Sequence, residues 1–370
     1  METVHSKRID EIDIIKAFAI IGMVWGHIGL PGKQFIYLFH MAVFFICSGI
    51  VCKEKYSESM TGLVKFTKNK IRSLYVPYVF CAILFTLLNN TFLRIGFYAP
   101  EECPYLCWKR IVIDCLRALL FVRGTQLSGA TWFLHALFFI SEVHAVGNFL
   151  LCHFKVEKKC LVQSVVSCLM LFCLFVLKSH LLNHKALYEY VSHFVLGYFA
   201  YCIGVNITDF KILSKLKDTT LSVRAVVFLL SLAVLLFGSR IGSGISIASG
   251  NFQNPFYFFA MSLSGFFMLF CIALLVEHIV FAKAAFVFLG KNTLPVVLWH
   301  LLAFKFMNAF YVFLFCLDKS LVSAYPTFYG QMQERRFIIG GGYLCIGLIL
   351  PVLLHLSRTK ITALWRKRHD

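Results

Sequence analysis

The sequence predicts an all-α integral membrane protein, a bundle of about ten transmembrane helices with both termini in the cytoplasm. The chain of 370 residues is 59% hydrophobic and only 15% charged, and its mean hydropathy is +0.77. Soluble domains are about 45–50% apolar and about 25% charged. Apolar runs of about twenty residues, each long enough to cross a hydrocarbon core about 30 Å thick, recur from end to end. These observations exclude soluble enzymes and disordered tails, and we expect residues 1–370 to form a single membrane-embedded domain.

The basic composition fits the same interpretation. The formal net charge is +18, which in a soluble protein would suggest nucleic-acid binding. In membrane proteins Lys and Arg gather in cytoplasmic loops and face anionic lipid, so an excess of basic residues is expected there. We therefore expect the lipid bilayer, and no nucleic acid, as a partner.

Most of the 14 cysteines lie inside apolar runs, where Cys packs as a small hydrophobic residue. Cys103 and Cys107, in the hydrophilic stretch EECPYLCWKR, are the only close pair outside a predicted span. The sequence leaves both a disulfide and two free thiols open for this pair.

Ten apolar runs are long enough to span the bilayer. The predicted spans are 12–30, 35–52, 73–95, 130–153, 160–182, 187–205, 221–239, 256–281, 292–317 and 337–357. The stretch 111–121 (IVIDCLRALLF) is too short to span and carries Asp114 and Arg117, so we interpret it as an interfacial helix within the loop 96–129. The Gly- and Ser-rich run at 238–251 follows no strand and is expected to be an outward-facing loop.

The distribution of Lys and Arg sets the predicted orientation. Under strict alternation, basic residues are more frequent at the termini and in the loops on the same side than in the opposite loops. The densest cluster follows the second span and comprises Lys53, Lys55, Lys65, Lys68, Lys70 and Arg72. Cytoplasmic loops carry such an excess, so both termini are expected to face the cytoplasm.

The first span contains Lys16 and His27, and ionisable groups are costly inside a bilayer and persist mainly where function uses them. In IDIIKAFAIIGMVWGHIGL, Lys16 lies near the cytoplasmic end and His27 follows eleven positions later. On an α-helix these residues share one face and stand about 16 Å apart along the axis. The alternative interpretations are a boundary lysine paired with Asp13 and a histidine at the outer interface.

His40 begins the second span, FHMAVFFICSG, and follows the first span across the short loop LPGKQF. We therefore expect His27 and His40 to approach the same outer cavity. Ser48 and Gly49, later in this span, are expected to permit close helix packing rather than to act as nucleophile and oxyanion donor, because the chain has no Gly-x-Ser-x-Gly motif.

Three stretches lie within the first 80 residues: RIDEIDIIKAFAIIGMVWGH, FHMAVFFICSGI and FTKNKIRSLYVPYVF. They resemble the membrane-bound acyltransferase-3 family, particularly its fucose 4-O-acetylase-like branch. Family members are similar in having a basic residue ten intervening positions before a histidine, an FH-x-x-x-FF-x-x-SG helix and a basic stretch running into Pro-Tyr. Lys16 stands where many members carry Arg, which keeps the charge but removes the planar guanidinium fork.

Two later segments extend the resemblance over almost the whole chain. GATWFLHALFFIS at 129–141 resembles the WFLxALF helix of the family, and LGKNTLPVVLWHLL at 289–302 resembles its Gly-Lys-x-Ser/Thr-Leu stretch that ends in histidine. The resemblance implies an O-acyltransferase that moves an acyl group, usually acetyl from acetyl-CoA, to a hydroxyl of a carbohydrate or polysaccharide precursor. It also implies a multi-pass protein of the plasma membrane, at family level the bacterial inner membrane.

The same resemblance suggests roles for individual residues. Catalytic roles fall to His27 as general base, to Lys16 and to His300 in the ninth span. Arg72, Lys70 and Lys68 would bind the phosphorylated head of the CoA donor at the cytoplasmic face. His40, Trp132 and His135 would bind the acceptor.

Each assignment has a structural alternative. Arg72 could anchor a loop at the membrane boundary, Trp132 could belong to an interfacial aromatic belt, and His135 and His300 could be packed core histidines. The chain has no Walker A motif and no ligand spacing that indicates zinc, so we expect no metal cofactor. The alternative function is a carrier or exporter of a lipid-linked sugar or a small organic anion, for which Pro295 and Pro351 would provide helix breaks.

Overall fold

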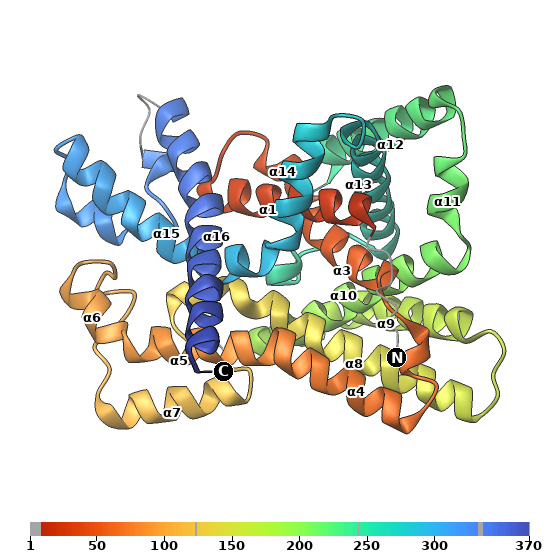
Figure 1. The fold of residues 1–370 in the computed structure, drawn as a ribbon, viewed down its shortest axis with the longest axis horizontal. Coiled ribbons are helices and arrows are strands. Elements are labelled where there is room, and N and C mark those ends of the chain that lie inside the picture. The colour runs from red at the N-terminus through yellow and green to blue at the C-terminus, as the bar shows by residue number, and fades with distance from the viewer. Residues whose placement is uncertain (1–8, 123, 243, 332–335, 370) are drawn as a thin grey trace. The chain divides into compact units, whose positions relative to one another are not determined.

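The computed structural model describes residues 9–122, 124–242, 244–331 and 336–369, and within these ranges the chain is helical with no β-strand (Figure 1). An isolated bridge pairs Ser246 with Asn251 in the predicted loop 238–251. The expectation of an all-α protein is therefore confirmed for the described residues.

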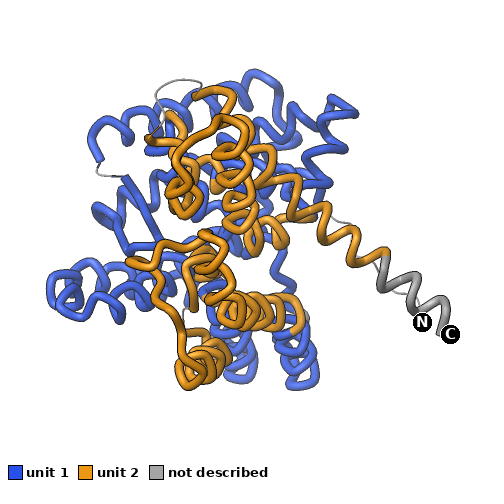
Figure 2. Tube along the Cα trace, turned by 90° about the vertical axis from the view of Figure 1, so that its left-hand side faces the viewer, with its two compact units in different colours: residues 1–22, 32–71, 136–291 blue, residues 23–31, 72–135, 292–370 orange. Residues whose placement is uncertain are grey.

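The chain divides into two compact units, which Figure 2 shows in different colours. Unit 1 is formed from residues 1–22, 32–71 and 136–291, and unit 2 from residues 23–31, 72–135 and 292–370. Two helices, α1 (Asp10–Ile28) and α8 (Trp132–His153), contribute residues to both units.

The remaining helices each belong to one unit. Unit 1 holds α2 (Lys33–Tyr37), α3 (His40–Ile50), α4 (Met60–Lys70), α9 (Lys159–Leu181), α10 (Lys185–Asp209), α11 (Ile212–Lys217), α12 (Leu221–Ile241), α13 (Pro255–Val276) and α14 (Val280–Lys291). Unit 2 holds α5 (Val76–Leu87), α6 (Asn89–Arg94), α7 (Trp108–Leu119), α15 (Thr293–Leu314) and α16 (Arg336–His369).

In unit 1, α3 and α10 cross with their backbones in direct contact. A methyl group at Gly49 would overlap the carbonyl oxygen of Tyr201, and one at Gly204 would overlap the carbonyl oxygen of Ile46. Small residues at a crossing allow the close approach by which membrane helices gain packing energy. The expectation that Gly49 serves helix packing is confirmed.

Unit 1 also contains a buried polar network that joins α8, α9 and α10. Gln163 Nε2 donates a hydrogen bond to Asn148 Oδ1 (2.5 Å), and Tyr198 donates its hydroxyl proton to Gln163 Oε1 (2.9 Å). His144 lies on the same face of α8, its Nε2 3.5 Å from Asn148 Nδ2. Because polar groups in an apolar bundle need partners, this network fixes the relative rotation of the three helices.

In unit 2, two tyrosines at the start of α5 hold the end of the short helix α7 and the residues that follow it. Tyr75 donates a hydrogen bond to the Leu119 carbonyl (2.9 Å), and Tyr78 donates to the Val122 carbonyl (3.2 Å). The sequence predicted an interfacial helix at 111–121, and the structure has a helix at Trp108–Leu119, which begins three residues and ends two residues earlier.

A buried lysine on α15 organises the segment that connects α15 to α16. Lys305 is fully buried, and its Nζ donates to the carbonyl oxygens of Ser323 (2.7 Å) and Ala324 (2.9 Å). Asn308, one turn later, also donates to the Ala324 carbonyl (3.0 Å), and its Oδ1 accepts a hydrogen bond from Tyr343 on α16 (2.5 Å). The polar side chains of α15 thereby hold the connection against the helices of unit 2.

Eight helical segments of the described chain are long and apolar enough to cross a membrane, which confirms a multi-pass membrane protein. One of the eight, Lys159–Asp209, contains both α9 and α10. Helix α1 is not among them, and its first two turns carry four charged residues, Asp10, Glu11, Asp13 and Lys16. The count of ten and the cytoplasmic location of the termini stay predictions, and residues 1–8 and 370 lie outside the described part.

The basic stretch 53–72, expected to be a loop, is largely helical. Helix α4 begins after Ser59, whose hydroxyl accepts a hydrogen bond from the Gly62 amide (3.2 Å). Its lysines lower the local hydropathy, so that an amphipathic helix resembles a loop in a hydropathy profile.

Candidate active site

Two histidines from different helices meet in unit 2. His27 lies near the C-terminal end of α1, and His300 lies in the second turn of α15. Their ring centroids are 5.1 Å apart, with an angle of 42° between the ring planes. His300 has no exposed surface, and His27 is half-buried. The two residues predicted to be catalytic histidines are therefore neighbours in space.

A hydrogen bond to the helix backbone fixes the protonation of the His300 ring. Nδ1 lies 2.7 Å from the carbonyl oxygen of Val296, one turn earlier on α15. A carbonyl oxygen only accepts, so Nδ1 carries the proton, and Nε2 of the neutral ring is an acceptor. Nε2 is buried and has no hydrogen-bond partner in the described structure. An unsatisfied buried polar atom costs about 1–3 kcal/mol, which makes this nitrogen a candidate contact for a ligand or a catalytic neighbour.

Apolar packing surrounds the histidine pair. The ring of Phe304 meets His300 edge to face, with centroids 5.6 Å apart. Helix α16 approaches closely at Gly347, where a methyl group would lie 2.7 Å from Phe304 Cε1 and 3.1 Å from Val24 Cγ1. The site is thus formed where the end of α1 meets α15 and α16. Such packing limits the access of water and strengthens electrostatic interactions at the two rings.

Lys16 belongs to unit 1 although it shares helix α1 with His27. Its Nζ lies 3.5 Å from Asp13 Oδ1, one turn earlier, and the Asp13 side chain is only 2% exposed. Helix α14 approaches the same turn so closely that a methyl group at Gly290 would overlap the Asp13 carbonyl oxygen. The alternative interpretation of Lys16, an ion pair with Asp13, is confirmed, and a catalytic role stays a prediction.

The three predicted donor-binding cations follow one another along the chain. Lys68 and Lys70 lie in the last turn of α4, and Arg72 lies in a π-helical turn over Ile71–Tyr75. Pro77 has no N–H to donate to the carbonyl four residues earlier, so a local widening of the helix before α5 is expected. Lys68 and Arg72 are exposed, which leaves both accessible to a ligand.

Lys70 is half-buried, and its Nζ lies 5.2 Å from the centroid of the Phe66 ring. On the same helix, Thr67 donates its hydroxyl proton to Glu142 Oε2 of α8 (2.7 Å). The basic helix α4 is therefore attached to the rest of unit 1 through Thr67, while Lys68 is exposed.

The three predicted acceptor-binding residues are divided between the units. His40, in unit 1, is buried, its Nδ1 lies 3.0 Å from the Ile36 carbonyl, and its ring stacks on Tyr37 at 4.8 Å. The approach of His27 and His40 stays a prediction because they belong to different units. In unit 2, His135 packs against Phe121 with centroids 5.0 Å apart. Trp132 is half-buried at the start of α8.

Lys305 and Asn308 are buried polar residues of unit 2 that are not among the predicted site residues. Both lie inside an apolar run of the sequence, LLAFKFMNAF. A polar residue inside an apolar run is the same feature that singles out Lys16, so the sequence could have pointed to these two residues as well. Unlike Lys16, which pairs with a carboxylate, Lys305 and Asn308 donate hydrogen bonds to backbone carbonyls. They thereby hold the segment between α15 and α16.

Comparison with known proteins identifies the family of this chain. A family model described as an acyltransferase domain, that of the acyltransferase-3 family, matches residues 9–357. No match is found among curated proteins or among solved structures. Among the described residues, no group of His, Cys, Asp and Glu side chains is arranged to hold a metal ion. Because the family model covers nearly the whole chain and the described part is built from membrane-spanning helices, the chain belongs to the acyltransferase-3 family of membrane acyltransferases.

Proposed function

We propose that this chain is an integral-membrane O-acetyltransferase of the plasma membrane, close to the fucose 4-O-acetylase-like branch of its family. It transfers the acetyl group of cytoplasmic acetyl-CoA to a hydroxyl of a carbohydrate or polysaccharide precursor. The observation that supports this proposal best is the His27–His300 pair in a chain of a membrane acyltransferase family. The half-buried imidazole of His27 lies beside the ring of His300, whose buried Nε2 can accept a hydrogen bond.

In the proposed reaction, His27 acts as the general base. It removes the proton of the acceptor hydroxyl while the hydroxyl oxygen attacks the thioester carbonyl carbon. The carbon–sulfur bond then breaks, and His27 returns the proton to the sulfur of the leaving CoA. The products are the O-acetylated acceptor and free CoA, and His27 ends in its starting state.

His300 has the role of positioning His27. Its Nε2 is an acceptor, and a centroid separation of 5.1 Å is short enough for a ring nitrogen of His27 to approach it. An N–H of His27 donated to His300 would leave the other nitrogen of His27 unprotonated, as a base requires. The Val296 carbonyl completes this arrangement because it keeps the proton of His300 on Nδ1.

The donor is proposed to bind on the cytoplasmic side. Lys68 and Arg72 are exposed near the junction of α4 and α5, where they can contact the phosphates of the CoA head, and Lys70 and Lys16 add positive charge. The thioester arm then extends into the helix bundle. With both termini cytoplasmic, α1 runs outward and carries His27 toward the outer leaflet, where His40, Trp132 and His135 are proposed to contact the acceptor.

Release of CoA from acetyl-CoA tests the enzymatic function against a carrier function. Purified protein is incubated with acetyl-CoA and a mixture of membrane glycolipids, and both free thiol and acetylated glycan are measured. We expect an equal amount of each product, because one acetyl group is transferred for each thioester cleaved. Uptake of a lipid-linked sugar or an organic anion into proteoliposomes without any CoA release would contradict acyl transfer and support the carrier.

A further inference from the structure

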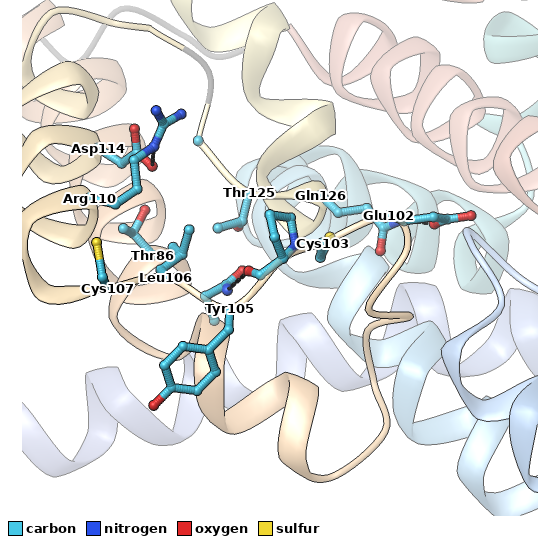
Figure 3. A pocket seen from close by; sticks show the side chains of 13 residues that line it. Thr86, Glu102, Cys103, Tyr105, Leu106, Cys107, Arg110, Asp114, Thr125 and Gln126 are labelled. Atoms are coloured by element: carbon cyan, nitrogen blue, oxygen red, sulfur yellow. Dashed lines mark hydrogen bonds and ion pairs between the residues drawn. The ribbon is translucent and has the colours of Figure 1, made fainter.

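Unit 2 contains a second recessed site that none of the predicted residues occupies. A pocket of about 710 Å³ lies between α7, the stretch from Glu102 to Cys107 and the stretch from Gly124 to Gln126 (Figure 3). Sites for small molecules typically measure about 300–1,000 Å³, so this pocket has the volume of a binding site. All of its lining residues belong to unit 2, which also contains the histidine pair.

Hydrogen bonds from two asparagines fix the wall of this pocket. Asn90 donates to the Leu106 carbonyl (2.8 Å) and accepts from the Leu106 amide (2.8 Å), so its side chain replaces a backbone partner for that residue. Asn89, only 3% exposed, donates to the Pro104 carbonyl (3.2 Å). A wall fixed in this way is formed before a ligand arrives, which lowers the entropic cost of binding.

The lining is polar but nearly balanced in charge. Figure 3 shows Arg110 and Asp114 on one side of the pocket and Glu102 with Gln126 on the other. Arg110 Nε lies 2.8 Å from Asp114 Oδ2, and Arg117 Nη1 lies 3.2 Å from the other oxygen of that carboxylate. Arg110 is the only cation among the described lining residues, and it is already paired. The phosphates of CoA would therefore find no unpaired guanidinium there, which argues against the donor as the ligand.

Gln126 contributes a polar atom to the lining that still needs a partner. Gln126 Nε2 donates to Glu102 Oε2 (2.7 Å), whereas Gln126 Oε1 is buried and has no hydrogen-bond partner in the described structure. Oε1 can accept from a hydroxyl, and Glu102 offers further acceptor positions. Tyr105 also lines the pocket, and its ring is 63% exposed and extends away from Glu102 and Gln126 (Figure 3). Acceptor atoms without an unpaired cation among the lining residues suit a neutral ligand with several hydroxyl groups, because each hydroxyl can donate a hydrogen bond.

Two series of contacts connect the pocket to the histidine pair. Thr86 lines the pocket, and its neighbour Phe85 packs edge to face on Trp299, which precedes His300. In the second series, Tyr325 donates a hydrogen bond to the Gln126 carbonyl (3.2 Å), and Thr327 of the same segment donates to the Ile28 carbonyl (3.4 Å), next to His27.

We propose that this pocket, lined by Glu102, Tyr105 and Gln126, binds the neutral sugar of the acceptor before the hydroxyl reaches His27. The proposal rests on the acetyltransferase function above, and it names the site at which that function recognises its acceptor. In the proposed orientation the loop 96–129 faces outward, so the acceptor enters from the side opposite to the donor.

Protection of a native cysteine tests the proposal without any need for turnover. Cys107 lines the pocket and is exposed, whereas burial raises the pKa of Cys103 and slows its reaction with maleimide. A full-length variant that retains Cys107 as its single cysteine is labelled with a maleimide in detergent. The probes are the methyl glycosides of glucose, galactose, mannose and fucose, with coenzyme A as the charged comparison. We expect at least one glycoside to slow labelling severalfold and saturably, and coenzyme A to leave the rate unchanged.

Matched variants assign the effect to the pocket. Gln126→Ala should abolish the protection, and Thr125→Val should weaken it, whereas Thr91→Ala, an exposed site outside the lining, should preserve it. A second variant retains only Cys316, which is exposed elsewhere in unit 2. The rate at which Cys316 reacts with the maleimide should be the same with and without the glycoside. If Gln126→Ala does not fold, as judged by gel filtration, the protection of Cys107 in Thr125→Val is used instead. Protection weaker than in the parent variant then supports the pocket as the binding site.

Several results would overturn the proposal. These are no protection by any of the four glycosides, protection by coenzyme A, or equal protection of Cys316. The labelling assay does not depend on acyl transfer, so failure of the two proposals can be distinguished. Protection of Cys107 in a protein that releases no CoA would contradict the acetyltransferase and leave sugar binding intact.

Discussion

At the scale of single residues, the two histidines illustrate what a sequence can and cannot provide. His27 and His300 each stand out as ionisable residues in apolar runs, and family resemblance adds to both. Their contact depends on how α1 and α15 pack, which no local pattern encodes. The hydrogen bond from His300 Nδ1 to the Val296 carbonyl is equally a product of the rotamer and the helix geometry.

Substitutions of His300 separate the roles of its two nitrogens. Asn can retain a donor near the position of Nδ1 but removes Nε2, whereas Gln can place a polar atom near Nε2. We expect His300→Asn to lower kcat by about 10–100-fold, the value of a hydrogen bond of about 1.5–3 kcal/mol, with the KM for acetyl-CoA unchanged. His300→Gln should retain more activity than His300→Asn. Equal kcat in the wild type and both variants would leave His300 as a packing residue only.

The exposed cation Arg72 provides a test of donor binding. Arg72→Ala should raise the KM for acetyl-CoA more than it lowers kcat, because contact with the CoA head stabilises the ground state and the transition state equally. Arg240→Ala, an exposed arginine at the end of α12, serves as the control. An unchanged KM for Arg72→Ala over a range of ionic strengths would show that this arginine only anchors the helix at the membrane boundary.

At the scale of elements, hydropathy predicted the long helices because burial in lipid demands long apolar runs. It missed α4, whose lysines make the exposed face polar, although the helix is held to α8 through Thr67 and Glu142. It also missed the wall of the pocket at Glu102 and Gln126, which depends on side-chain hydrogen bonds between Asn90 and the backbone of Leu106. Such bonds follow no periodic pattern, so they become visible only in three dimensions.

The crossing of α3 and α10 yields a stability prediction. Gly204→Ala should lower the thermal stability in detergent by about 1–3 kcal/mol, because the new methyl group meets the backbone at Ile46, which cannot move aside as a side chain can. Gly341→Ala on α16 is the matched control, because nothing lies within 4 Å of its added methyl group. Equal melting temperatures for the two variants would contradict the backbone contact between α3 and α10.

At the scale of the whole molecule, the proposal depends on the orientation of the chain. The excess of basic residues predicts that α4 lies on the cytoplasmic side, and the loop after α1 would then lie outside. Cysteines introduced at two exposed positions report the two sides in a cysteine-depleted background: Lys33→Cys at the start of α2, directly after that loop, and Glu58→Cys before α4. Neighbouring Ser57 is buried and would be a poor reporter.

We expect Lys33→Cys to react with a membrane-impermeant thiol reagent in intact cells and Glu58→Cys to react only after lysis. The opposite pattern would place His27 toward the cytoplasm. Donor and acceptor would then meet on one side of the membrane, and the pocket at Glu102 and Gln126 would open to the cytoplasm.

The central claim is that His27 removes the proton of the acceptor in an acetyl transfer. The most direct measurement compares the rate of CoA release from acetyl-CoA, with glycolipid acceptor present, among purified wild type, His27→Ala and His27→Gln. His153→Gln, an exposed histidine on α8, is the control and should match the wild type. We expect both His27 variants to fold and insert normally and to lose about 10²–10⁴-fold in turnover, because each lacks the base. More than about a tenth of the wild-type turnover in both variants would contradict the claim.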